Sequence, residues 1–135
     1  MLRKAKPASA NAEKALQAMQ TSLADIAAES WRFDLALQRV VKRMDVMEAE
    51  RFLRQYEYFT DRVRTALEKA DIVCVDLTGQ PYDPGMAAQA MNLDEFEEDE
   101  ALIVTRTIEP VILHGGRVMK TGMVMVGRAE NGNEA

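Results

Sequence analysis

The sequence predicts an α+β protein in which a long helical stalk, formed by two copies of the chain, carries a small β-rich head. Three observations predict this class. An apolar heptad pattern is sustained through the first part of the chain, Gly and Pro are absent between Ala8 and Thr78, and strand-like runs with glycine turns close the sequence. The chain has 135 residues, a length typical of one domain, which stalk and head together make up.

A heptad pattern from Leu16 to Met47 predicts a helix that needs a partner helix along its whole length. Apolar residues recur at alternating steps of three and four, and Ser30 is the one polar exception. At about 1.5 Å of rise per residue the span is roughly 48 Å long. A chain of this length cannot wrap a core around such a rod, so we expect a homodimer. The expected dimer contacts are Leu16, Met19, Leu23, Ile26, Phe33, Leu37, Val40, Met44 and Met47.

A second apolar series follows Met47 after a step of five residues across Glu48–Arg51, and it indicates a second bundle helix. Five residues turn the apolar face of an α-helix by roughly 140°. Two arrangements fit this change. The chain folds back near Glu48–Arg51 in a tight hairpin, which gives a four-helix bundle in the dimer, or one helix continues and changes neighbours. The absence of turn residues slightly favours a bend or a very short connection.

The composition changes after Asp71 to that of a β-rich head. A short apolar run at 72–75 precedes a cluster of turn residues at 78–85, and strand-like runs follow at 101–108, 110–113 and 117–126. Gly115 and Gly116 supply the positive φ angles that a hairpin between the last two runs needs. The expected divisions are a flexible N-terminus at 1–12, a helical dimerisation region at 13–71, the head at 72–128 and a flexible tail at 129–135.

Composition narrows the function classes. A net charge of −5 argues against a general nucleic-acid binder, which needs a basic face. No apolar run approaches the ~20 residues that span a bilayer, and the basic start of the chain lacks the apolar stretch of a secretory signal. We therefore expect a cytoplasmic protein without membrane contact. Phosphate loops, Cys/His metal spacing and nucleophile elbows are absent from the sequence, so we expect neither an enzyme nor a bound metal or cofactor.

Two motifs in the head match those of a known family in order and spacing. A Gly-x-Pro-x-Asp-Pro motif at 79–84 follows the first strand, and a Gly-Arg pair at 116–117 leads into a Met-Val-x-Val motif at 123–126. With the heptad-bearing stalk, these motifs resemble the GrpE family, the nucleotide exchange factors of DnaK-type chaperones, from about Tyr56 to Arg128. The resemblance implies a homodimer whose β-head docks on the nucleotide-binding domain of such a chaperone and promotes ADP release.

The same resemblance implies that Arg117, Val126 and Ile108 contact the chaperone. The alternative for Arg117 is a solvated charge on an edge strand, which discourages aggregation. The alternative for Val126 and Ile108 is packing within the head. The alternative function is a coiled-coil dimeric adaptor whose head keeps this fold but docks on a protein other than a chaperone.

Two single residues have structural interpretations. Trp31 lies beside the heptad pattern, and we expect the bundle to cover it. Cys74 lies in an apolar strand without a basic neighbour in sequence, so we expect a small buried hydrophobic residue rather than a reactive thiol.

Overall fold

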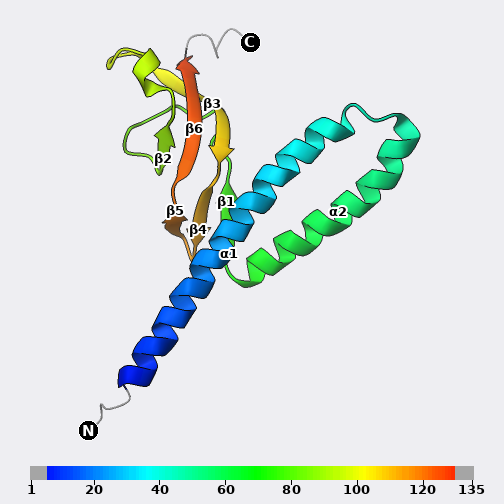
Figure 1. Cartoon of the computed structure of the whole chain (residues 1–135). Coiled ribbons are helices and arrows are strands. Elements are labelled where there is room, and N and C mark those ends of the chain that lie inside the picture. Colours follow the sequence, from blue (N-terminus) through cyan, green and yellow to red (C-terminus); the bar gives the residue numbers. More distant parts are fainter. Residues whose placement is uncertain (1–5, 130–135) are drawn as a thin grey trace.

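The structure, a computed structural model, describes residues 6–129 as two helices followed by a β-rich head (Figure 1). This order confirms the predicted α+β class. The helices are α1 (Lys6–Val41) and α2 (Val46–Lys69), and a single 3-10 turn, η1, covers Leu93–Glu95. The strands are β1 (Ile72–Val75), β2 (Ala88–Ala90), β3 (Leu102–Glu109), β4 (Val111–His114), β5 (Arg117–Lys120) and β6 (Gly122–Arg128).

The chain folds back between the helices at residues 42–45, a few residues before the predicted position (Figure 1). Of the two arrangements that the sequence allowed, the structure has the hairpin. Asp45 marks the new start, because its side chain accepts a hydrogen bond of 2.9 Å from the Glu48 N–H and so caps α2. The prediction that Met44 and Met47 continue the apolar face of the first helix is therefore wrong. Met44 lies in the connection and Met47 in the first turn of α2.

The predicted flexible segments at the two ends of the chain fall only partly within residues 6–129. Helix α1 begins at Lys6, inside the segment 1–12 that was expected to be flexible. Residues 1–5 and 130–135, which include most of the expected tail, lie outside the described residues.

The strands of the head form two three-stranded sheets. Sheet A has the order β1-β4-β5 with antiparallel neighbours, and sheet B has the order β2-β6-β3 with β2 parallel to β6. Gly122 begins β6 where the chain passes from sheet A to sheet B. A Cβ there would lie 2.8 Å from the Glu109 carbonyl oxygen, so the crossing requires glycine.

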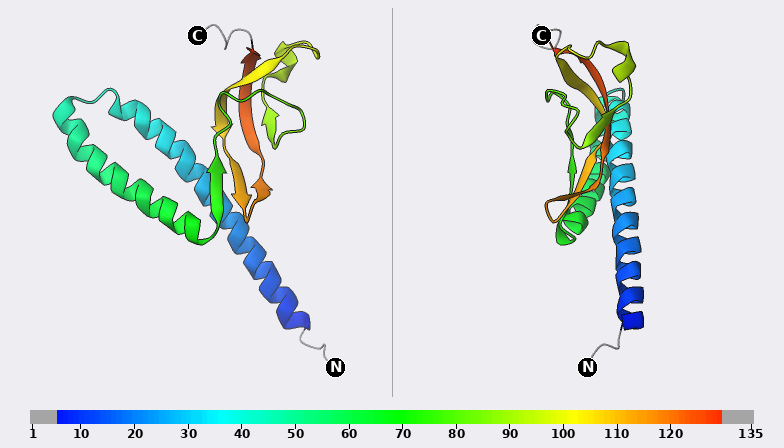
Figure 2. Two further views of the ribbon diagram at one scale, coloured as in Figure 1. Left: turned by 180° about the vertical axis from the view of Figure 1, so that it is seen from behind. Right: turned by 90° about the vertical axis from the view of Figure 1, so that its left-hand side faces the viewer.

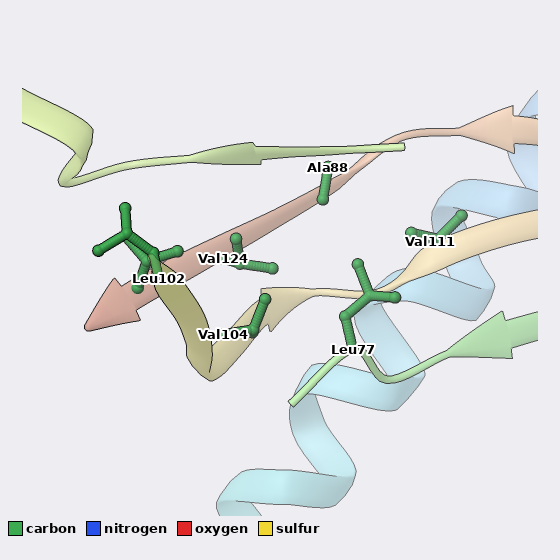
Figure 3. Packing of buried hydrophobic residues seen from close by; sticks show 7 residues of the cluster. Leu77, Ala88, Leu102, Val104, Val111 and Val124 are labelled. Atoms are coloured by element: carbon green, nitrogen blue, oxygen red, sulfur yellow. The ribbon is translucent and has the colours of Figure 1, made fainter. Parts of the chain in front are cut away.

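Two apolar clusters hold the molecule together. The head core lies mainly on sheet B, with Leu77 from the segment after β1 and Val111 from β4 (Figure 3). It contains Leu77, Ala88, Leu102, Val104, Val111, Val124 and Val126. The second cluster joins helix to head. Ala24, Ala27 and Ala28 of α1 pack against Ile72 and Ile112 of sheet A, and the side view in Figure 2 shows α1 against this face. Alanines allow the helix axis to approach the sheet closely, which fixes the head on α1.

The first part of α1 projects beyond the rest of the chain (Figures 1 and 2). Residues 9–19 are all exposed, although Leu16 and Met19 are large and apolar. Isolated helices of this length are marginal in water, so the projecting part of α1 is a segment that a packing partner would stabilise.

Candidate partner-binding surfaces

The tip of the β4–β5 hairpin presents an exposed cationic side chain. Gly115 and Gly116 adopt positive φ angles of 58° and 82°, and Arg117 follows them at the start of β5. The Gly115 N–H donates to the Asp71 carbonyl at 3.0 Å, and Asp71 is itself left-handed with φ of 57°. This bond ties the tip to the junction of α2 and β1. The hairpin therefore holds the backbone of Arg117 in a defined place while its side chain stays exposed.

Arg117 differs from the nearby Lys120 in its charge partners. The Lys120 ammonium lies 3.2 Å from an Asp25 carboxylate oxygen on α1 and 3.9 Å from one of Glu109. Among the described residues the structure assigns no ion pair to Arg117. Lys120 thus links the head to α1, whereas the guanidinium of Arg117 is available to a carboxylate of another molecule.

The other two residues implied in partner contact occupy different positions. Val126 is only 3% exposed and belongs to the head core, so its side chain packs and does not present a surface. The prediction that Val126 contacts a partner is therefore corrected: Val126 packs within the head. Ile108 is half-buried on β3. Both residues belong to sheet B and Arg117 to sheet A, so the three do not share one sheet surface.

The helical hairpin leaves an apolar stripe uncovered. On α1 the side chains of Ile26, Phe33 and Val40 are about half exposed or more, as are Leu16 and Met19, whereas Leu23 and Leu37 are half-buried. Helix α2 contains no buried residue at all. A helix without a buried face does not gain its stability from the contacts seen within one chain.

A groove of about 340 Å³ separates the two helices near β1. Its apolar walls include Trp31, Phe59, Val63 and Leu67, and Cys74 lies on its β1 side. Trp31 is half-buried here rather than enclosed. Burial raises the pKa of the Cys74 thiol, which keeps it protonated at neutral pH and lowers its reactivity.

A polar clasp joins the helices farther from the head, and sequence reasoning missed it. The Tyr56 hydroxyl donates to the Asp34 carboxylate, and the Gln38 amide donates to the Tyr56 oxygen at 3.4 Å. Asp34 and Tyr56 are 22 positions apart, so only the fold-back at 42–45 brings them together. A sequence pattern offers no local signal for such a pair.

Comparisons with known protein families, with curated proteins and with solved structures find no match to this chain. Within residues 6–129, no group of three or more His, Cys, Asp and Glu side chains is arranged to hold a metal ion. Within this same range no helix combines the length and the apolar character needed to cross a membrane.

Proposed function

We propose that this protein is a GrpE-like nucleotide exchange factor: a homodimer whose head binds the nucleotide-binding domain of a DnaK-type chaperone and promotes ADP release. The observation that carries the proposal is Arg117, which stands exposed on an anchored hairpin tip and forms no ion pair with another residue in the range 6–129. Its place after Gly116 is the place of the contact arginine in the family that the sequence resembles. A hairpin with these features is suited to docking on a protein surface.

The uncovered stripe of the stalk supports the homodimer. Burying a large apolar side chain contributes about 1.5–3 kcal/mol, and α1 carries five such side chains that one chain leaves exposed. Two hairpins packed along this stripe form a four-helix bundle that also gives α2 a buried face. The projecting first part of α1 then gains a partner helix.

Exchange activity requires no bond to be made or broken by this protein. A head that binds the open form of the nucleotide-binding domain more tightly than the closed form shifts the chaperone toward the open form. By linkage, the same preference lowers the affinity of the chaperone for ADP. A coupling of about 1–3 kcal/mol has a modest effect on the equilibrium, so the rate of ADP release is the informative quantity.

The proposed function is tested by following labelled ADP as it leaves the DnaK-type chaperone of the same organism. The chaperone is preloaded, chased with unlabelled nucleotide, and compared with and without the full-length protein. We expect faster release that saturates with protein concentration. Unchanged release from every DnaK-type chaperone of that genome would rule out the exchange role.

The burial of Val126 favours one alternative, a dimeric adaptor with the same head and a different partner. Only Arg117 of the three implied contact residues is fully presented at the surface. An adaptor keeps the stalk and the head but recovers no chaperone when the tagged protein is isolated from its own cells. Recovery of a chaperone that depends on Arg117 contradicts the adaptor.

A further inference from the structure

The outer edge of strand β1 lies open beside the groove between the helices. β1 is the first strand in the order β1-β4-β5, and within residues 6–129 only β4 pairs with its backbone. In an antiparallel pair, every second residue directs its N–H and C=O groups away from the neighbouring strand. The outer side of β1 therefore carries backbone donors and acceptors that no other described residue satisfies.

The groove follows this open edge. Ile72, Val73 and Cys74 all line it, although successive side chains of a strand point to opposite faces of the sheet. A cavity that touches three successive residues therefore lies along the edge of the strand and not over one face. The view from behind in Figure 2 shows the same order, with the green strand β1 between the helices and β4.

The walls of the groove suit an extended peptide. Trp31 of α1 and Phe59, Val63 and Leu67 of α2 supply large apolar side chains beside β1. The space of about 340 Å³ falls within the range of roughly 300–1,000 Å³ that is typical of ligand pockets. β1 itself has neither the charge nor the proline that usually protects an exposed edge. Because this edge is recessed between helices, a single extended chain can reach it.

We propose that the groove binds an extended apolar polypeptide segment with basic flanks, which adds a strand to β1. The backbone of the segment hydrogen-bonds to the open edge, and its alternate side chains contact the aromatic wall. Charge selects the flanks, because Asp34 and Glu68 line the groove. Arg64, the one cation among the described lining residues, lies 2.8 Å from the Asp61 carboxylate. This polypeptide-binding function goes beyond nucleotide exchange and does not rest on it.

The terminal residues 1–5 and 130–135 do not fit as the occupant. Residues 1–5 reach at most about 18 Å when extended, whereas Ala27 on the groove wall is about 32 Å along α1 from Lys6. Residues 130–135 carry two glutamates and no Lys or Arg, so the carboxylates of the groove repel them. The segment therefore comes from elsewhere.

A second folded copy does not fit either. Its own β1 edge is recessed between helices in the same way, so two folded copies cannot bring these edges together. The side chains that we assign to the dimer, among them Ile26, Phe33 and Val40, do not line the groove. The proposed dimer thus does not use this site, and the occupant is a separate extended chain.

Trp31 is the only tryptophan of the chain, so its emission reports on the groove. The probe is the heptapeptide Lys-Leu-Val-Thr-Val-Leu-Lys, added to the full-length protein. We expect a blue shift of the Trp31 emission, and a saturable rise in anisotropy when the peptide carries fluorescein. N-methylation of the three central amides keeps the side chains but removes backbone donors, and it raises the Kd about tenfold or more. Glutamates in place of the flanking lysines raise the Kd roughly three- to tenfold.

Thr60→Phe places a ring in the groove, because Thr60 lines it, and raises the Kd of the heptapeptide about tenfold or more while the Tm stays the same. Thr65→Phe is the matched control, since Thr65 is an exposed residue of α2 that does not line the groove. This variant binds as the unmodified protein does. If the heptapeptide fails to bind, or if the N-methylated probe, the Glu-flanked probe or the Thr60 variant gives an unchanged Kd, the inference is wrong.

Discussion

The side-chain amide of Asn92 pairs with the backbone of Val126 in both directions. Its Nδ2 donates to the Val126 carbonyl at 2.9 Å, and the Val126 N–H donates to Oδ1 at 3.0 Å. Strand β2, which pairs with β6, ends at Ala90, and beyond it the amide takes the place of a continuing strand. Asn92 is buried, so it satisfies two backbone groups in a region that water does not reach.

Asn92→Ala is expected to lower the free energy of unfolding by about 1–3 kcal/mol, because it leaves a buried N–H and a buried carbonyl without partners. Urea unfolding followed by circular dichroism measures the change. Gln89→Ala is the control, since Gln89 is an exposed residue on the adjacent strand β2. Equal stabilities for the two variants would contradict the bridging role of Asn92.

Ala27→Leu tests the contact between α1 and the head. Ala27 is almost fully buried against sheet A, so a larger side chain forces the helix away and costs about 1–3 kcal/mol of stability. Ala36→Leu makes the same change at an exposed site on the same helix and leaves stability nearly unaltered, because Ala and Leu have similar helix propensity. Thermal unfolding of both variants compares the two sites. A leucine tolerated equally at both would show that the helix is not held closely on the sheet.

Asp45 gives α2 a pH-dependent start. The Glu48 N–H, which donates to its carboxylate, holds the pKa of Asp45 below the ordinary value of 3.8. A carboxyl with a lowered pKa in the folded state stabilises the protein above its unfolded pKa, and this stabilisation is lost as the pH falls through the folded pKa. Asp45→Ala therefore lowers the Tm at neutral pH, and its difference from the unmodified protein shrinks as the pH falls below 3.8 through the lowered pKa of the folded state.

Asp45→Asn separates capping from charge. Asparagine caps a helix without ionising, so this variant keeps most of the Tm at neutral pH and loses the contribution that titrates below pH 3.8. The measurement is thermal unfolding over a series of buffers. A constant gap between the alanine variant and the unmodified protein across all pH values would argue against an ionised cap.

Ile26→Ser with Phe33→Ser tests the stalk as a dimer interface. Both side chains lie on the exposed stripe, and their loss is expected to raise the dimer dissociation constant by about two orders of magnitude or more. Sedimentation equilibrium then gives a mass that moves toward the 15.1 kDa of one chain. Ala18→Ser with Ala36→Ser is the control, because both residues are exposed on another side of α1. A single-chain mass for the unmodified protein at micromolar concentration would exclude the dimer.

Arg117→Ala tests the hairpin tip. Removing an arginine that reaches a partner carboxylate is expected to weaken binding of the nucleotide-binding domain about thirtyfold, while the solution mass of the protein stays unchanged. Arg117→Lys keeps the charge but not the planar fork, so it restores binding only in part. Arg106→Ala removes another exposed arginine, on β3, and serves as the control. If the Arg117 and Arg106 variants bind the nucleotide-binding domain equally well, the hairpin tip is not part of the docking surface.

The helices, the order of the elements and the glycine hairpin were predictable because each depends on local chemistry. Gly115 and Gly116 mark their turn by the φ angles that only glycine adopts easily. The position of the fold-back was predicted imperfectly. A heptad pattern that carries on in phase across residues 42–45 hides a break, and the one local signal was Asp45, a residue that often begins a helix.

The face on which each head residue lies was not predictable to the same degree. Val126 and Val118 both lie in the one strand-like run predicted at 117–126, yet Val126 is in the core and Val118 is half exposed. The outcome depends on which sheet each strand joins and on the crossing at Gly122. Strand pairing between distant segments is a property of the whole fold.

By itself, the sequence determined that two helices precede a β-rich head and, apart from β2 (Ala88–Ala90), where the strand-like segments lie, because periodicity, turn residues and charge act over a few neighbouring positions. It also determined that an apolar stripe would remain on α1. Only the tertiary structure decided which apolar residues the head encloses and which it leaves outside, such as Val73 and Val118. The physical reason is that burial depends on contacts between segments far apart in the chain, as in the pairing of Asn92 with Val126.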